Sequence, residues 1–331
     1  MNFYEFVGQK EIITGLKHAL LEDRVGHASL FTGPKGIGKK TLAAIFAARL
    51  LCVNSSTEER CGTCPACSLI EHHGNPDFQV VGEGEDGIGV EEIRKLQGDI
   101  LVKPLYSARK VYLIPDADRM TPQAQNCLLK ILEEPPRHAV FILTTANSNA
   151  LLETVRSRTV KYSFRKNTFE EVGGYLEKQL GKDHPGLDFV ISYADGIIGV
   201  AMELLQTEGF AAMRDQAARL VVELAKGELL DVFEWYGFFE ANKSRVDMIF
   251  DMLLLFYRDL LMLSKTGNEK LLINSDKKDI IVGNVSRFSA GKLADNIECI
   301  ERTRLNIKQN ANYQLAIEVM LMKIQEEPFK W

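Results

Sequence analysis

A glycine-rich stretch at residues 33–41 has the residue types that bind phosphate. It reads GPKGIGKKT, and it lies between a short apolar run at 28–31 and an apolar segment at 42–48. A strand, a glycine loop and a helix in this order let backbone N–H groups surround an anion, and the helix N-terminus adds a favourable dipole. The candidate nucleotide-binding residues are Gly33, Gly36, Gly38, Lys39 and Thr41.

The metal-binding position of this loop departs from the usual pattern. The residue directly after the loop lysine is normally Ser or Thr, because its hydroxyl ligates Mg²⁺. Here that residue is Lys40, and Thr41 comes one position later. One position turns a side chain by about 100° around a helix, so we expect Thr41 to miss the metal. The sequence therefore predicts a loop suited to ATP or ADP phosphates, with an incomplete Mg²⁺ site.

Four cysteines form a second group that could do chemistry. Cys61, Cys64 and Cys67 have C-x₂-C-x₂-C spacing, and Cys52 lies nine residues upstream. Four thiolates close a tetrahedral Zn²⁺ site that serves structure and not catalysis. The segment 53–75 has few apolar residues, so a bound metal would supply the folding free energy that a small hydrophobic core cannot.

Other interpretations of the cysteines stay open. An iron–sulfur cluster uses similar spacing, although its usual run has a fourth nearby Cys before Pro. Cys52 ends an apolar helix, so the alternative to ligation is a small core residue. In that case His72 or His73 would be the fourth ligand.

The elements that position these residues follow from periodicity. Apolar runs predict buried strands at 28–32, 110–114 and 139–145, with a short strand at 78–81. Helices are expected at 8–24, from 39 to about 52, from 90 onward and at 120–134. This alternation predicts an α/β domain with a parallel sheet, whose ligands bind at the carboxyl ends of the strands.

The pattern changes after residue 165. Small helices are expected at 169–180, 189–194 and 200–205, and apolar stripes at helical spacing continue from 209 to the end. We therefore expect residues 209–331 to form an all-α domain.

Composition narrows the functional classes. A net charge of −5 over 331 residues argues against a chain that holds nucleic acid alone by a wide basic surface. We find neither an apolar run long enough to cross a bilayer nor a signal-peptide pattern at the N-terminus. We expect a cytoplasmic protein with reduced thiols and no membrane partner.

Several stretches resemble a known family. They are FVGQ at 6–9, HASLFTGP at 27–34, the four cysteines, NCLLKILEEPP at 126–136 and SRT at 157–159. With them, nearly the whole chain resembles the clamp-loader subunits of bacterial DNA polymerase III, an AAA+ family, and most of all its delta-prime branch. The resemblance implies an AAA+ phosphate-loop core at 1–165 with a zinc-binding insertion at 52–67. It also implies a helical lid at 166–208 and a helical collar at 209–331 that joins subunits in a ring.

The same resemblance implies that hydrolysis is lost. Active members have Asp-Glu-Ala-Asp after the strand at 110–114, and here Pro115 replaces the metal-binding Asp and Asp116 the catalytic Glu. Gly199 falls where active members carry an arginine that senses nucleotide. The alternative is that Asp116 or Asp118 ligates the metal instead. Lys40 and Pro115 each replace a residue that would ligate Mg²⁺. The loss of both ligands argues against ATPase activity in this chain.

One arginine is expected to act on a neighbour. Ser157-Arg158-Thr159 resembles the family's Ser-Arg-Cys motif, whose arginine reaches the ATP of the adjacent subunit. A planar, always charged guanidinium suits developing phosphate charge. Arg156 lies two residues away and is the alternative. The resemblance implies that the polar side of the helix at 120–134, which includes Gln125, faces the neighbour, and a contact with DNA is the alternative.

The resemblance, together with the missing metal ligands, thus implies a non-hydrolysing stator of the replicative clamp loader, within the DNA polymerase III holoenzyme. The resemblance implies a hetero-pentamer with gamma/tau and delta subunits, acting on the sliding clamp and primed DNA. One alternative is an active clamp-loader ATPase that uses Lys39, Thr41, Asp116 and Asp118. The other is an independent zinc-bearing nucleotide-binding protein.

Overall fold

A computed structural model describes residues 2–54, 59–72, 74–82, 84, 87–181, 186–226 and 232–325. The chain forms two compact units, Met1–Tyr175 with Asp195–Val200, and Leu176–Ala194 with Ala201–Trp331. Residues 166–208 are divided between the two units, and a separate lid stays a prediction.

The first unit is built on a five-stranded parallel sheet. Its strands are β1 (Ala28–Thr32), β2 (Phe78–Val80), β3 (Lys110–Ile114), β4 (Ala139–Thr145) and β5 (Val160–Ser163). The order across the sheet is β2-β3-β4-β1-β5, and β1 pairs with β4 from Ala28 opposite Phe141 to Thr32 opposite Thr145. The predicted parallel α/β architecture is therefore confirmed.

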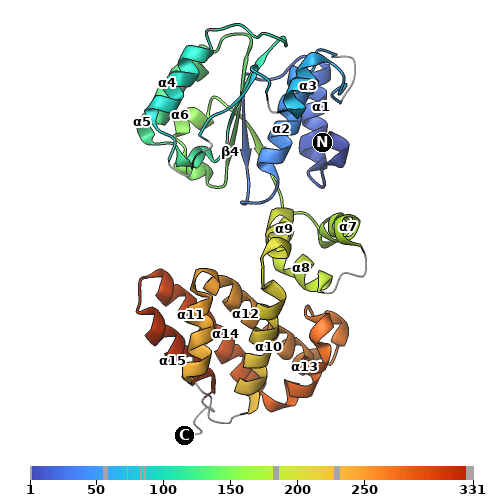
Figure 1. Ribbon diagram of the computed structural model, residues 1–331, viewed down its shortest axis with the longest axis vertical. Coiled ribbons are helices and arrows are strands. Elements are labelled where there is room, and N and C mark those ends of the chain that lie inside the picture. Colours follow the sequence, from blue (N-terminus) through green and yellow to red (C-terminus); the bar gives the residue numbers. More distant parts are fainter. Residues whose placement is uncertain are drawn as a thin grey trace. The chain divides into compact units, whose positions relative to one another are not determined.

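Helices cover both faces of the sheet (Figure 1). They are α1 (Lys10–Leu21), α2 (Lys39–Leu51), α3 (Pro65–Glu71), α4 (Val90–Asp99), α5 (Pro122–Glu133) and α6 (Glu153–Arg156). One core packs α1 and α2 on the sheet through residues such as Leu16 and Phe46, and the other packs α4, α5 and α6 through Ile93, Leu128 and Val155. The strands β1, β3 and β4 are buried along their whole length, which explains their continuous apolar sequences.

Among the elements of this unit that were not expected from the sequence are β5, α3 and the short helix α6. The strand β5 pairs with β1 in parallel but is largely exposed, so it lacks the apolar run that marks a buried strand. The helix α3 begins after Cys64 with Pro65 at its first position, where proline has no N–H to lose. Its seven residues are too few to show an apolar stripe at helical spacing.

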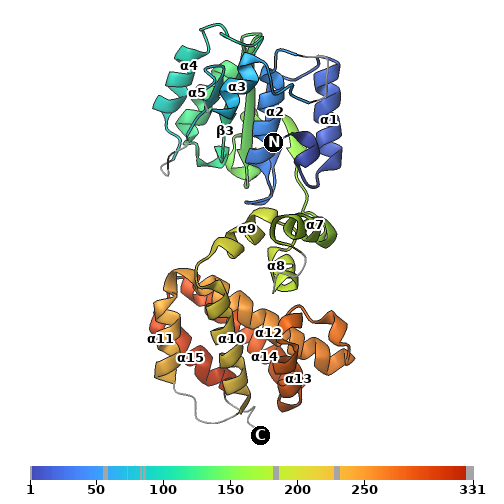
Figure 2. The ribbon, with the colours of Figure 1, turned by 45° about the vertical axis from the view of Figure 1, so that its right-hand side comes forward.

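The second unit is helical in its described residues, as predicted (Figure 2). Its helices are α10 (Phe210–Lys226), α11 (Val232–Ala241), α12 (Val246–Thr266), α13 (Lys278–Asn284), α14 (Ala290–Lys308) and α15 (Tyr313–Gln325). The long α12 packs against α10, α13 and α14, and α15 packs against α11 and α14. The small helix α8 (Leu187–Ala194) belongs to this unit, whereas α7 (Phe169–Leu180) and α9 (Ile198–Gln206) have residues in both.

None of the described helices is both long enough and apolar enough to span a bilayer.

Candidate functional site

The glycine loop lies between β1 and α2, as the sequence predicted. Gly36 and Gly38 have φ angles of 80° and 97°, in the left-handed region that favours glycine. Within the part of the chain that the structure describes, the N–H groups of Gly36, Gly38 and Lys39 meet no hydrogen-bond acceptor. Since α2 begins at Lys39, these donors and the helix dipole together form an anion-binding geometry.

The loop lysine is engaged by its own loop. Lys39 is only 6% exposed, and its Nζ donates to the carbonyl oxygens of Gly33 at 2.7 Å and Pro34 at 2.8 Å. Burial lowers the pKa of Lys39, while Asp116 and Asp118 oppose that shift. In this conformation the ammonium group stabilises the loop from within.

A second segment packs directly on the loop. The N–H of Gly199 donates to the carbonyl oxygen of Gly36 at 3.0 Å. A Cβ atom at residue 199 would lie 2.5 Å from that oxygen and 2.7 Å from the Cα of Gly36. Ile197 is also in contact range, because a Cβ at residue 36 would lie 3.1 Å from its Cγ2. No side chain fits at position 199 unless backbone moves, so glycine is required here for close approach.

The residues after β3 are held by threonines at the end of β4. The Asp116 N–H donates to Thr144 Oγ1 at 3.1 Å, and the Thr145 hydroxyl donates to Asp118 Oδ1 at 2.6 Å. Asp116 is exposed with a φ of 47°, and Pro115 is buried. The Asp118 carboxylate therefore already has one partner within the chain.

The side chains that follow the loop lysine both lie in solvent. Lys40 and Thr41 are exposed, whereas Lys39 is buried. The one-residue shift thus separates the Thr41 hydroxyl from the buried side of the loop.

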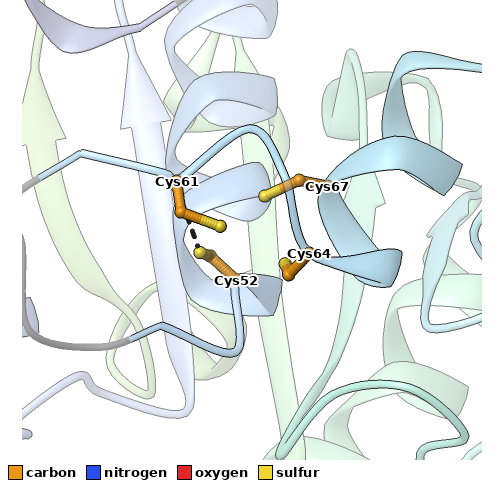
Figure 3. A group of neighbouring side chains, drawn as sticks. All are labelled: Cys52, Cys61, Cys64 and Cys67. Carbon is orange, nitrogen blue, oxygen red and sulfur yellow. Dashed lines mark hydrogen bonds between the residues drawn. The ribbon is translucent and has the colours of Figure 1, made fainter.

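The four cysteines come together as one group (Figure 3). Their Sγ atoms all lie within 4.8 Å of one another. Cys52 follows α2, Cys61 lies in the loop, Cys64 precedes α3 and Cys67 lies within α3. Cys52 and Cys67 are buried, and the Cys61 N–H donates to Cys52 Sγ at 3.3 Å. This donor set of four sulfurs fits a structural metal ion.

The thiols differ in acidity according to their surroundings. Hydrogen bonds from the backbone N–H groups of Thr63 and Cys64 lower the pKa of Cys61 to about 6. Burial raises the pKa of Cys67 to about 12 and also raises that of Cys52. A divalent cation that binds all four thiolates would offset the cost of ionising the two buried ones.

His72, one of the two histidines proposed as reserve ligands, is not part of this group. His72 Nδ1 lies 2.8 Å from the Ser68 carbonyl oxygen on its own helix. His73 lies outside the described residues. Cys52 supplies the fourth sulfur of the group, the position that the sequence predicted for it.

Arg158 lies just after α6 and beside the C-terminal end of α5. Its Nη2 lies 2.7 Å from Glu133 Oε1, and its Nη1 donates to the Thr154 carbonyl oxygen at 3.1 Å. The Arg158 side chain is 36% exposed. Arg156 is exposed on the same segment. Sequence reasoning did not find the Glu133 contact.

One residue of the expected polar face is in fact internal. Gln125 is 2% exposed, and its amide joins α5 to the segment before α6. The expectation that Gln125 faces a neighbour was wrong, because its position on α5 faces the buried backbone at residues 150–152.

Comparisons with known proteins identify relatives along nearly the whole chain. The profile of the family described as "DNA polymerase III, delta subunit" matches residues 8–168, and that of "DNA polymerase III, delta subunit, C terminal" matches residues 213–326. DNA polymerase III subunit delta' of Bacillus subtilis is 30% identical over 96% of each chain.

A second relative is longer than this chain. DNA polymerase III subunit tau of Bacillus subtilis is 28% identical over 97% of this chain, which spans 61% of that protein. Among solved structures, a gamma subunit-related protein of Thermotoga maritima covers 95% of this chain and 98% of its own, with 16% identity and a TM-score of 0.42.

Proposed function

This chain belongs to the delta-prime family of DNA polymerase III subunits, and from that premise we propose that it is a non-hydrolysing clamp-loader subunit. In this proposal it assembles with gamma/tau and delta subunits and helps load the sliding clamp on primed DNA. It acts on the ATP of a neighbouring subunit through Arg158.

The observation that carries the non-hydrolysing role is the contact between Gly199 and the loop. The family's nucleotide-sensing arginine would need a side chain at position 199, and a Cβ there would lie 2.5 Å from the Gly36 carbonyl oxygen. Lys39 is turned onto the carbonyls of Gly33 and Pro34. These contacts support a loop that serves as a packed structural element.

The metal ligands support the same proposal. Mg²⁺ neutralises charge on the phosphate oxygens during transfer, and little else replaces it. Lys40 and Pro115 have no suitable ligand atom. The alternative ligand Asp118 accepts a hydrogen bond from Thr145, although it lies close enough to Lys39 to influence its pKa.

Arg158 supports action on a neighbour. Its guanidinium is held at the surface by one carbonyl and one carboxylate, and its side chain stays 36% exposed. Arginine fingers of this kind typically contribute about 10³–10⁵ in rate.

The group of four cysteines supports a structural zinc ion. Cys52, Cys61, Cys64 and Cys67 would hold it, and it would link the end of α2 to α3 across the segment between them. The ion would stabilise this insertion and take no part in chemistry.

The test is ATP turnover of the reconstituted, DNA-stimulated loader. We compare Arg158→Ala with Arg156→Ala as a matched control, and with Lys39→Ala. We expect Arg158→Ala to slow turnover sharply, while Arg156→Ala and Lys39→Ala leave it close to wild type in loaders that assemble. Loss of turnover with Lys39→Ala in an intact assembly would instead identify an active ATPase subunit.

A further inference from the structure

A buried side chain fixes α5 to the segment that leads into α6. The Gln125 amide nitrogen donates to the carbonyl oxygens of Met120 at 3.2 Å and Ala150 at 3.1 Å, and its Oε1 accepts from the Leu152 N–H at 2.7 Å. Val155 of α6 is fully buried in the same core. The position of α6 relative to α5 is therefore fixed, and so is the position of the residues at their C-terminal ends.

Glu133, at the C-terminal end of α5, forms an ion pair with Arg158, which follows α6. The guanidinium has five N–H donors, and it uses one on the Thr154 carbonyl and one on Glu133. The Thr154 contact lies within the same short segment as Arg158, whereas Glu133 belongs to a different helix. Glu133 thus supplies the contact that ties the guanidinium to the rigid α5 frame.

The position of Glu133 is unfavourable without that contact. It is the last residue of α5, and Glu134 follows it as the C-cap. The C-terminal end of a helix carries partial negative charge and favours Lys or Arg over a carboxylate. A carboxylate placed against the local preference points to a partner elsewhere, and Arg158 is that partner.

We propose that Glu133 is a positioning residue for Arg158. It orders the guanidinium before a neighbouring ATP site is reached, and this inference rests on the finger role proposed above. An unrestrained arginine loses rotamer entropy when it is ordered, and prior ordering reduces that loss. Because exposed ion pairs are weak, the expected effect is about two- to five-fold in turnover.

The experiment measures ATP turnover of the reconstituted loader with Glu133→Ala, Glu133→Gln and the matched control Glu134→Gln. We expect Glu133→Ala to lower kcat about two- to five-fold at unchanged KM for ATP. Glu133→Gln keeps the Oε1 acceptor and loses less. Glu134→Gln has no effect, and added salt narrows the gap between wild type and Glu133→Ala.

Two further measurements separate positioning from general damage. Combined with Arg158→Ala, the Glu133→Ala change should have no additional effect, because its only route is through Arg158. In the free chain, the ¹⁵N heteronuclear NOE of the Arg158 Nε–Hε group should fall in Glu133→Ala and stay unchanged in Glu134→Gln.

The contrary outcomes are distinct. Unchanged or raised turnover in Glu133→Ala, beside a sharp loss in Arg158→Ala, refutes the positioning role and leaves the proposed function intact. An equal loss from Glu133→Ala in the Arg158→Ala background shows an effect on the fold and also refutes it. If Arg158→Ala itself changes nothing, the proposed function fails and the positioning role fails with it.

Discussion

Replacing Gly199 by alanine tests the close contact with Gly36 on which the proposed non-hydrolysing role depends. The added Cβ would lie 2.5 Å from the carbonyl oxygen, 2.7 Å from the Cα and 3.0 Å from the carbonyl carbon of Gly36. All three are backbone atoms, so neither side can yield by a side-chain rotation. Overpacking of this kind costs about 1–3 kcal/mol.

The same change threatens a hydrogen bond. The Gly199 N–H to Gly36 carbonyl bond is 3.0 Å long, and its loss adds about 0.5–1.5 kcal/mol. We therefore expect Gly199→Ala to lower the free energy of unfolding of the first unit by roughly 1.5–4.5 kcal/mol. That unit includes both residues.

The assay is urea unfolding followed by circular dichroism, with Gly15→Ala as the matched control. Gly15 lies within α1, and a Cβ there would meet no atom within 4 Å. Alanine should therefore stabilise this helix by up to about 1 kcal/mol. If Gly199→Ala is as stable as Gly15→Ala, the close approach to Gly36 does not exist and the argument for a packed loop is wrong.

Two other predictions concern stability. Removing zinc with a chelator under reducing conditions, or the Cys67→Ser change, should lower the unfolding midpoint by roughly 5–10 °C. Cys127 lies outside the group of four sulfurs, so Cys127→Ser should leave the midpoint unchanged. A chelator that leaves the midpoint unchanged would count against a bound metal. Although burial opposes it, bidentate pairing with Arg214 holds the pKa of Asp276 below its ordinary 3.8. A carboxylate whose pKa is lower in the folded state stabilises the fold at pH values above its pKa in the unfolded state. That stability is lost as the pH falls through its pKa in the folded state. The stability that wild type holds over Asp276→Asn should therefore shrink below about pH 4 in urea unfolding, and a difference independent of pH would contradict it.

The sequence predicted the strands whose burial is uniform. The strands at 110–114 and 139–145 have the predicted bounds because both faces are covered, which leaves a continuous apolar run. The helix at 169–180 also has its predicted bounds. The edge strand β5 was missed because its side chains are mostly exposed.

Long-range polar contacts could not be predicted from spacing. Asp77 is 1% exposed, and its carboxylate accepts the backbone N–H groups of residues 105–107 at 2.7–2.9 Å. In the sequence it is only one residue of an Asn-Pro-Asp turn. Gln125 likewise reads as a polar surface residue until α6 is placed beside α5. Glu133 did leave a signal, since a carboxylate at a helix C-terminus opposes the dipole.

The retained phosphate-loop sequence has a structural explanation of its own. Lys39 links the carbonyl oxygens of Gly33 and Pro34 within the loop, and Gly36 allows Gly199 to approach. Removing the lysine would leave two carbonyls without this charged donor, and a side chain at residue 36 would be strained at its φ of 80°. Loss of either residue therefore disturbs the loop whether or not a nucleotide binds. Because the motif can persist for packing alone, a defect of Lys39→Ala must be assigned only after assembly of the loader has been measured separately from turnover.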